Sequence, residues 1–309
     1  HGLPVRRGAD CRTEKSRLKT VQLISQPLRR LQTRRARRGS GGGSHAESFR
    51  EQSELLDFLS KRKEWQRPEG ALTLEQMLQT EDKRPRLQLI EMLAAVPGPA
   101  AGAVLARRAL FDLAADVRQE AVHALKKRPH EEYRQTLLAG LRYPWAPVAD
   151  HAAEALAALD EQGAVSALDE PDPAAPVRVG HDRWVVSELV QVNHLRNCLL
   201  CHAPSFGRDD PVRGLVPTPG QPLPVEYYAS RRGNFVRADV TYLRQDFSVM
   251  QPVVDPGHWP AQQRFDYLVR QRELTAHDLA QRQAGDRAAA REKGAQAVTS
   301  YPQREAVLF

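Results

Sequence analysis

The residues best suited to chemistry form one short run, Cys198-Leu199-Leu200-Cys201-His202. A C-x-x-C-H run is typical of covalent haem attachment. Two thiols three positions apart can each add to a vinyl group of one porphyrin, and the adjacent histidine can then bind the iron. The motif therefore predicts one covalent haem c. Cys198 and Cys201 would form the thioethers, and His202 would be the proximal iron ligand.

A sixth ligand to such an iron would be methionine or histidine. Met250 is the first candidate, because it follows His202 along the chain in the strand-like segment 246–252. Packing of the Met250 side chain into a core explains this residue equally well. His194 and His258 are the alternative ligands, and an iron with five ligands also remains open. An open position would suit peroxide or oxygen chemistry, but no residue can be named for the pocket this requires.

The same cysteines have the spacing of zinc ligands, with His194 or His202 as a third ligand. A structural zinc takes four ligands, and the remaining cysteine of the chain, Cys11, lies far away in the basic tail region. A redox-active thiol pair is expected beside a βαβ pattern, and none surrounds this one. Zinc is therefore the less favoured cofactor, and haem the more favoured.

From about residue 46 to 165, apolar residues recur at three- and four-residue spacing, which predicts helices. Segments 116–125 and 147–156 superimpose, because aligning Val117 with Val148 also aligns Ala121 with Ala152 and Leu125 with Leu156. A helical pattern repeated at this spacing indicates stacked helix pairs. The two segments resemble the short form of the HEAT repeat, in which a helix opens with Asp or Pro and carries Ala-x-x-Ala-Leu at its packing positions.

The composition changes after residue 169, and twelve of the 22 prolines lie in residues 171–260. Residues 184–195 are in helical phase, whereas residues 235–242 alternate as a half-buried strand would. Phe265, Leu268 and Val269 suggest a helix after Pro260. Residues 274–297 suggest a further, largely exposed helix.

Positive charge is concentrated at the start of the chain. Residues 1–50 hold 13 Lys/Arg against 3 Asp/Glu, and the remainder holds 32 against 35. Six arginines in residues 29–38 precede a Gly/Ser run at 39–44. This cluster fits an arm for nucleic acid or anionic lipid, but no aromatic side chains are interleaved for base stacking. A flexible linker is therefore the favoured interpretation.

Several function classes are excluded or unsupported. No stretch reaches the roughly 18 apolar residues of a membrane-spanning helix, and three cysteines cannot form a disulfide scaffold. No G-x-S-x-G, P-loop, H-E-x-x-H or dinucleotide fingerprint is present. The chain is thus expected to be a carrier or binding protein rather than a catalyst.

Residues 193–205 and 235–249 carry a closer resemblance. They read Asn-His-Leu-Arg-Asn-Cys-Leu-Leu-Cys-His-Ala-Pro-Ser and Phe-Val-Arg-Ala-Asp-Val-Thr-Tyr-Leu-Arg-Gln-Asp-Phe-Ser-Val. Both resemble exported planctomycete HEAT-repeat proteins with a cytochrome c-type motif, a likeness that covers about residues 80–309. The resemblance implies haem binding and a periplasmic or envelope location. Small soluble cytochromes c are helical after the motif, whereas proline-rich loops and a strand follow it here.

We therefore predict a mainly α protein, a short HEAT-like helical solenoid with an inserted Pro-rich α+β module that bears the C-x-x-C-H motif. The predicted divisions are a largely disordered basic tail and linker, the helical repeats, the haem module and the start of a truncated further repeat, at residues 1–45, 46–168, 169–298 and 299–309. We expect an exported fragment of a longer chain that transfers electrons, with a protein or redox partner on its helical surface. The alternative is a non-enzymatic interaction scaffold with a structural zinc or no metal.

Overall fold

The structure is a computed structural model of the 309-residue chain. It describes residues 23–24, 27–28, 45–61, 65–161, 172–173, 175–200, 202–205, 213–223, 233–241, 245–282 and 284. The predicted tail and linker (1–45) and truncated repeat (299–309) fall almost entirely outside these residues. Within them, 50% of residues are helical and 21% lie in strands. The prediction of a mainly α fold is therefore wrong, because the described residues form a mixed α+β structure with two antiparallel sheets.

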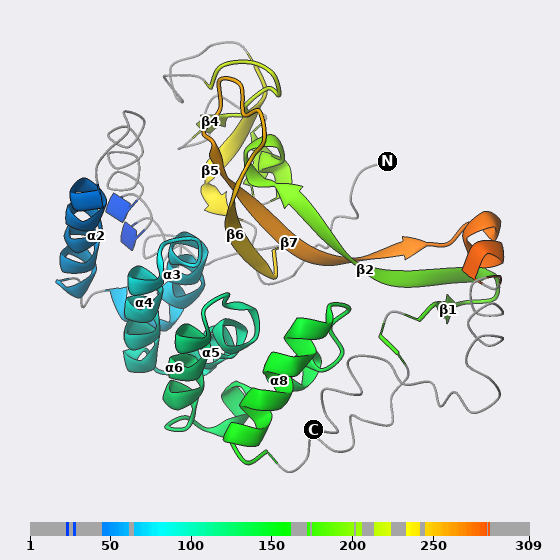
Figure 1. Ribbon diagram of the computed structural model, residues 1–309, viewed down its shortest axis with the longest axis horizontal. Helices are drawn as coiled ribbons and strands as arrows, with labels where there is room; N and C mark the ends of the chain where they lie inside the picture. The colour runs from blue at the N-terminus through cyan, green and yellow to red at the C-terminus, as the bar shows by residue number, and fades with distance from the viewer. Residues whose placement is uncertain are drawn as a thin grey trace. The chain divides into compact units, whose positions relative to one another are not determined.

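Helices make up the first half of the described chain (Figure 1). Pro99 and Pro147 stand in the first turns of their helices, where a missing N–H costs no hydrogen bond. The helices are α2 (His45–Ser60), α3 (Ala71–Leu78), α4 (Lys83–Ala95), α5 (Pro99–Phe111), α6 (Ala115–Leu125), α7 (Arg134–Gly140) and α8 (Ala146–Ala158), with short 3-10 turns at η3 (Pro68–Gly70) and η4 (His130–Glu132).

The repeat seen in the sequence corresponds to α6 and α8. When the two helices are aligned as in the sequence, they bury the same four positions. These are Val117, Ala121, Ala124 and Leu125 in α6, and Val148, Ala152, Ala155 and Leu156 in α8. The apolar spacing thus predicted both the helices and the face that each one buries. Assignment to the HEAT class stays a prediction.

The strands form two sheets. The larger has the order β1-β2-β7-β6, with β1 at Val177–Val179, β2 at Arg183–Asn193, β7 at Gln262–Glu273 and β6 at Phe247–Pro252. The smaller has the order β3-β5-β4, with β3 at His202–Ser205, β5 at Phe235–Thr241 and β4 at Arg213–Leu215. In Figure 1, β2 and β7 run side by side as a long ribbon. The strands predicted at 235–242 and 246–252 are confirmed as β5 and β6.

Two segments predicted to be helical are strands instead, and they account for the error in fold class. Residues 184–195 contribute to β2, and the segment after Pro260 forms β7. Short apolar runs fit both the helical and the extended period, so spacing alone did not separate the two. Four valines in β2, and Phe265, Tyr267 and Val269 in β7, supply the β-branched and aromatic side chains that favour strands.

The helix predicted to begin at Leu274 is described over residues 276–282. Thr275 and Asp278 form a reciprocal cap at its start. The Thr275 backbone N–H donates to Asp278 Oδ2 at 2.8 Å, and the Asp278 N–H donates to Thr275 Oγ1 at 3.2 Å. Such a capping box satisfies two of the backbone donors that a helix N-terminus leaves open.

The chain divides into two compact units, each built from two stretches of sequence. The first unit comprises residues 1–104 and 191–267, and the second comprises residues 105–190 and 268–309. In the first unit α4 packs against α2 and α3, and in the second α7 packs against α8. All residues of the candidate site described below belong to the first unit. Among the described residues, no helix has the length and apolar character needed to cross a membrane.

Candidate functional site

The motif begins on two short turns that follow strand β2. This strand ends at Asn193 and is followed by the 3-10 turns η6 (His194–Arg196) and η7 (Cys198–Leu200). Asn193 begins the first turn, because its Oδ1 accepts from the Leu195 N–H at 3.0 Å. Asn197, between the turns, donates from Nδ2 to the Asn193 carbonyl at 2.9 Å. Local polar contacts therefore fix the chain path that leads into the motif.

Cys198 is a free, half-buried thiol. Its Sγ donates to the Leu195 carbonyl across 3.8 Å, and burial raises the pKa of the thiol. The next two residues differ in exposure, because Leu200 is buried and Leu199 is 57% exposed. Cys201 lies outside the described residues.

His202 is the first residue of β3 and is half-buried. It pairs with Thr241 of β5, and the register of the two strands shifts between His202 and Pro204. An irregularity of this kind redirects side chains and is common beside functional sites. The predicted proximal ligand is thus held by a sheet rather than by a helix.

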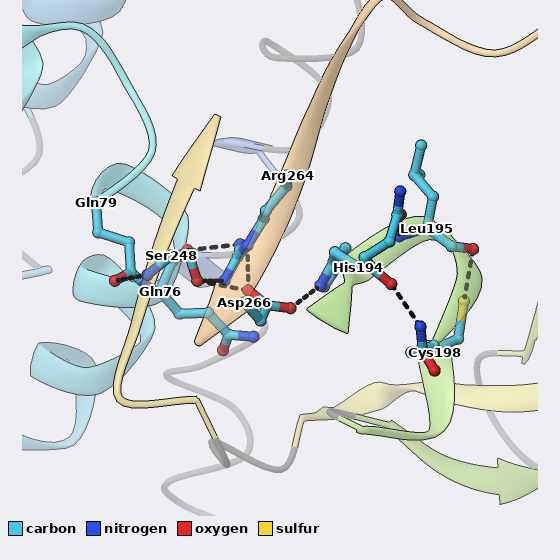
Figure 2. Close-up of polar contacts among 10 residues, drawn as sticks. Gln76, Gln79, His194, Leu195, Cys198, Ser248, Arg264 and Asp266 are labelled. Carbon is cyan, nitrogen blue, oxygen red and sulfur yellow. Dashed lines mark hydrogen bonds and ion pairs between the residues drawn. The ribbon is translucent and has the colours of Figure 1, made fainter. Parts of the chain in front are cut away.

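A buried ionic cluster lies directly before the motif, centred on Asp266 of β7. The Asp266 side chain is fully buried. Its Oδ2 accepts from His194 Nδ1 at 2.6 Å, and its Oδ1 accepts from Arg264 Nε at 2.9 Å and from Ser248 Oγ at 2.5 Å. Figure 2 shows His194, Arg264 and Ser248 converging on this carboxylate. We call Asp266, His194, Arg264 and Ser248 the Asp266 cluster.

The electrostatics of the cluster keep Asp266 ionised. Burial of the carboxyl raises its pKa. The hydrogen bond from His194, the charge of Arg264, the charge that a protonated His194 adds and the hydrogen bond from Ser248 outweigh that effect and lower the pKa to about 2. A carboxylate that is ionised at neutral pH can only accept hydrogen bonds, so Nδ1 of His194 carries the proton in their contact.

Helix α3 and the turn after it contact the Asp266 cluster. Gln79 Oε1 accepts from the Ser248 backbone N–H at 3.1 Å. Arg264 Nη1 donates to the Gln76 carbonyl at 3.0 Å, and its Nη2 donates to Ser248 Oγ at 2.9 Å. The cluster thus joins β6, β7, η6 and the α3 segment within the first unit.

Sequence reasoning missed the Asp266 cluster apart from His194. Asp266 is 72 residues from His194, and the contact depends on β2 and β7 being neighbours in the larger sheet. In the pairing of β6 with β7, Ser248 faces Asp266 directly across the strands. Because the segment after Pro260 was interpreted as a helix, nothing placed its polar side chains beside His194. The β-branched and aromatic side chains of that segment were the available signal.

The structure places the other candidate ligands as follows. Met250 lies in β6, is 40% exposed, and has Arg264 as its cross-strand partner. His258 is exposed on the loop between β6 and β7. Strand alternation puts Met250 on the same face of the sheet as Ser248. No hydrogen bond joins either residue to the Asp266 cluster among the described contacts.

No group of three or more His, Cys, Asp and Glu side chains that could hold a metal ion occurs within the described residues. Because Cys201 is not among them, a zinc bound through both cysteines stays a prediction. The donors that are described, a free thiol at Cys198 and a half-buried imidazole at His202, match in chemical type the donors that covalent haem requires.

Comparisons with protein-family models, with curated proteins and with solved structures found no match to this chain.

Proposed function

We propose that this protein is a c-type haem protein that transfers electrons. Cys198 and Cys201 would hold one haem through thioethers, and His202 would be its proximal ligand. The observation that carries the proposal is the Cys198-x-x-Cys201-His202 run, since few other chemistries need two thiols and an imidazole at this spacing. When bound, the haem iron supplies a reversible one-electron couple.

The surroundings of the motif support this proposal. Cys198 is free and half-buried, so its thiol is available for attachment yet partly shielded from water. Leu199 exposes 57% of its surface beside that thiol. An exposed leucine next to the attachment residue is apolar surface that a macrocycle would cover. Buried Leu200 anchors the same turn to the protein interior.

Thioether attachment takes place where cytochrome c maturation enzymes act, so the proposal includes export to the periplasm or cell envelope. The helical part of the chain would serve as the docking surface for a protein partner, including a redox partner.

The test is maturation of the full chain in an exporting host that has cytochrome c maturation machinery. Pyridine haemochrome spectra and zinc analysis would be measured on the parent chain, on the double variant Cys198→Ser/Cys201→Ser, and on Cys11→Ser as the matched control. We expect one haem per chain in the parent and in Cys11→Ser, and no covalent haem in the double variant, which has neither thiol of the motif.

Two other outcomes would overturn the proposal. One zinc per chain without haem would make the protein a scaffold with a structural metal. Neither metal, in a chain that is folded and exported, would leave an interaction scaffold without a cofactor.

A further inference from the structure

We propose that His194 is the second histidine that would hold the haem iron and that Asp266 is its positioning residue. This inference rests on the proposed haem function and deepens it. The structure supplies what the sequence did not, namely a contact that orients one of the three candidate ligands.

The orientation of the His194 ring is the first argument. Its Nδ1 donates to Asp266 Oδ2 at 2.6 Å, and that carboxylate is fully buried. In the neutral ring Nε2 is then the nitrogen with the lone pair. A histidine that binds a metal almost always donates its other ring N–H to a carboxylate, carbonyl or water, which fixes the tautomer and makes the imidazole a better ligand.

The rigidity of Asp266 is the second argument. Its other oxygen, Oδ1, accepts from Arg264 at 2.9 Å and from Ser248 at 2.5 Å, so turning the carboxylate away from His194 would break both contacts. Arg264 is held in turn by the carbonyl of Gln76. The His194 side chain is 26% exposed, which leaves part of it open to solvent. A fixed Nδ1 contact and a partly open ring are the arrangement expected of a ligand held ready for a metal.

The position along the chain is the third argument. His194 opens η6, a turn in contact with η7, and η7 carries Cys198. Strand β3, which begins at His202, also contacts η7. Both histidines therefore flank the turn that would carry the haem.

Among the described contacts, neither Met250 nor His258 has a hydrogen bond that would orient it as a ligand. Met250 is 40% exposed, and the residue opposite it is Arg264, whose guanidinium is directed into the Asp266 cluster. His258 is exposed on a loop. Among the described residues, only His194 of the three has a hydrogen bond to a buried carboxylate.

The experiment uses the haem-loaded full chain and compares His194→Ala with Met250→Leu. We expect His194→Ala to keep its haem, because the thioethers and His202 are intact. Its visible and electron paramagnetic resonance spectra should change from six-coordinate low-spin to high-spin, and added imidazole should restore the low-spin spectrum. Met250→Leu should retain the low-spin spectrum of the parent.

The positioning role of Asp266 is tested by the reduction potential of the haem. Asp266→Asn removes the negative charge but keeps the shape of the side chain, so His194 should donate less electron density to the iron. We expect a higher reduction potential with the low-spin state retained. An unchanged potential would remove Asp266 from the proposal.

A measurement on the parent chain covers the case in which His194→Ala does not fold. Magnetic circular dichroism in the near infrared distinguishes two histidine ligands from a histidine and a methionine. Spectra of the histidine-methionine type, a high-spin parent, or a low-spin His194→Ala variant would each overturn the proposal. A parent without covalent haem would instead overturn the proposed function.

Discussion

At the scale of single residues, Asp266 is a fully buried carboxylate held by three side chains. Burying a carboxylate without partners costs several kcal/mol. Here three side chains donate to it, and Arg264 supplies a compensating charge. Because a buried ion pair seldom stabilises a fold more than apolar packing does, the cluster is better explained by the position it gives His194.

The lowered pKa of Asp266 predicts how stability depends on pH. A carboxyl whose pKa falls from 3.8 to about 2 on folding stabilises the fold above pH 4, and this contribution is lost as pH falls toward 2. Its size at neutral pH is about 2 kcal/mol. We expect Asp266→Asn to unfold at lower urea concentration than the parent at pH 7. The difference between the two chains should shrink between pH 4 and pH 2.

Ser248→Ala is the matched comparison, because it removes one donor and leaves the carboxylate in place. The urea midpoint of Ser248→Ala should still fall between pH 4 and pH 2, but by less than the midpoint of the parent falls. Parallel curves for the parent and Asp266→Asn from pH 7 to pH 2 would contradict the predicted role of the carboxylate.

At the scale of elements, the helices could be predicted from the sequence and two main strands could not. Segments 116–125 and 147–156 have a long apolar period that only a helix satisfies, and both are helical. Residues 184–195 were wrongly predicted, because Val-rich runs fit either period until a partner strand is known. The C-x-x-C-H motif needed no partner strand to be identified. The contact of Asp266 with His194 could not be predicted in the same way, because it depends on β2 and β7 being neighbours in the sheet.

The close approach of α7 to its neighbours gives a prediction at this scale. A Cβ placed on Gly140 would lie 2.7 Å from the Leu110 side chain and 3.0 Å from Ala152 Cβ. Leucine can adjust, whereas the Ala152 Cβ moves only with helix α8. Alanine would add roughly 1 kcal/mol of helix propensity, but overpacking costs about 1–3 kcal/mol. We expect Gly140→Ala to lower the free energy of unfolding.

Ala139→Gly, at the exposed neighbouring position of α7, measures how much helix propensity contributes to stability here. It should lower the free energy of unfolding by roughly 1 kcal/mol, the amount by which Gly140→Ala would raise it if packing imposed no penalty. Thermal and urea unfolding of both variants would be compared with the parent. A Gly140→Ala protein more stable than the parent would show that α7 and α8 are not closely packed at this point.

At the scale of the whole molecule, the net charge of +7 belongs to one end of the sequence. Residues 1–50 hold 13 Lys/Arg and 3 Asp/Glu, whereas the rest of the chain holds 32 and 35. The arginine cluster at 29–38 lies outside the described residues, and its role as a linker or as an arm for anionic partners stays a prediction. The attraction between charges in solvent is screened within about 10 Å at 0.1 M salt.

Removal of residues 29–38 separates the two roles. The deletion removes six arginines and no acidic residue, which takes the net charge from +7 to +1. If the segment is a linker, we expect the parent and the deleted chain to share the same unfolding temperature. Neither should then bind anionic vesicles or duplex DNA at about 0.15 M salt, because charge attraction over a Debye length is weak there. If only the parent binds, and its binding weakens steeply as the salt concentration rises, the linker interpretation is contradicted. The segment is then an electrostatic arm. Co-sedimentation with vesicles and a DNA titration across a salt series would measure this.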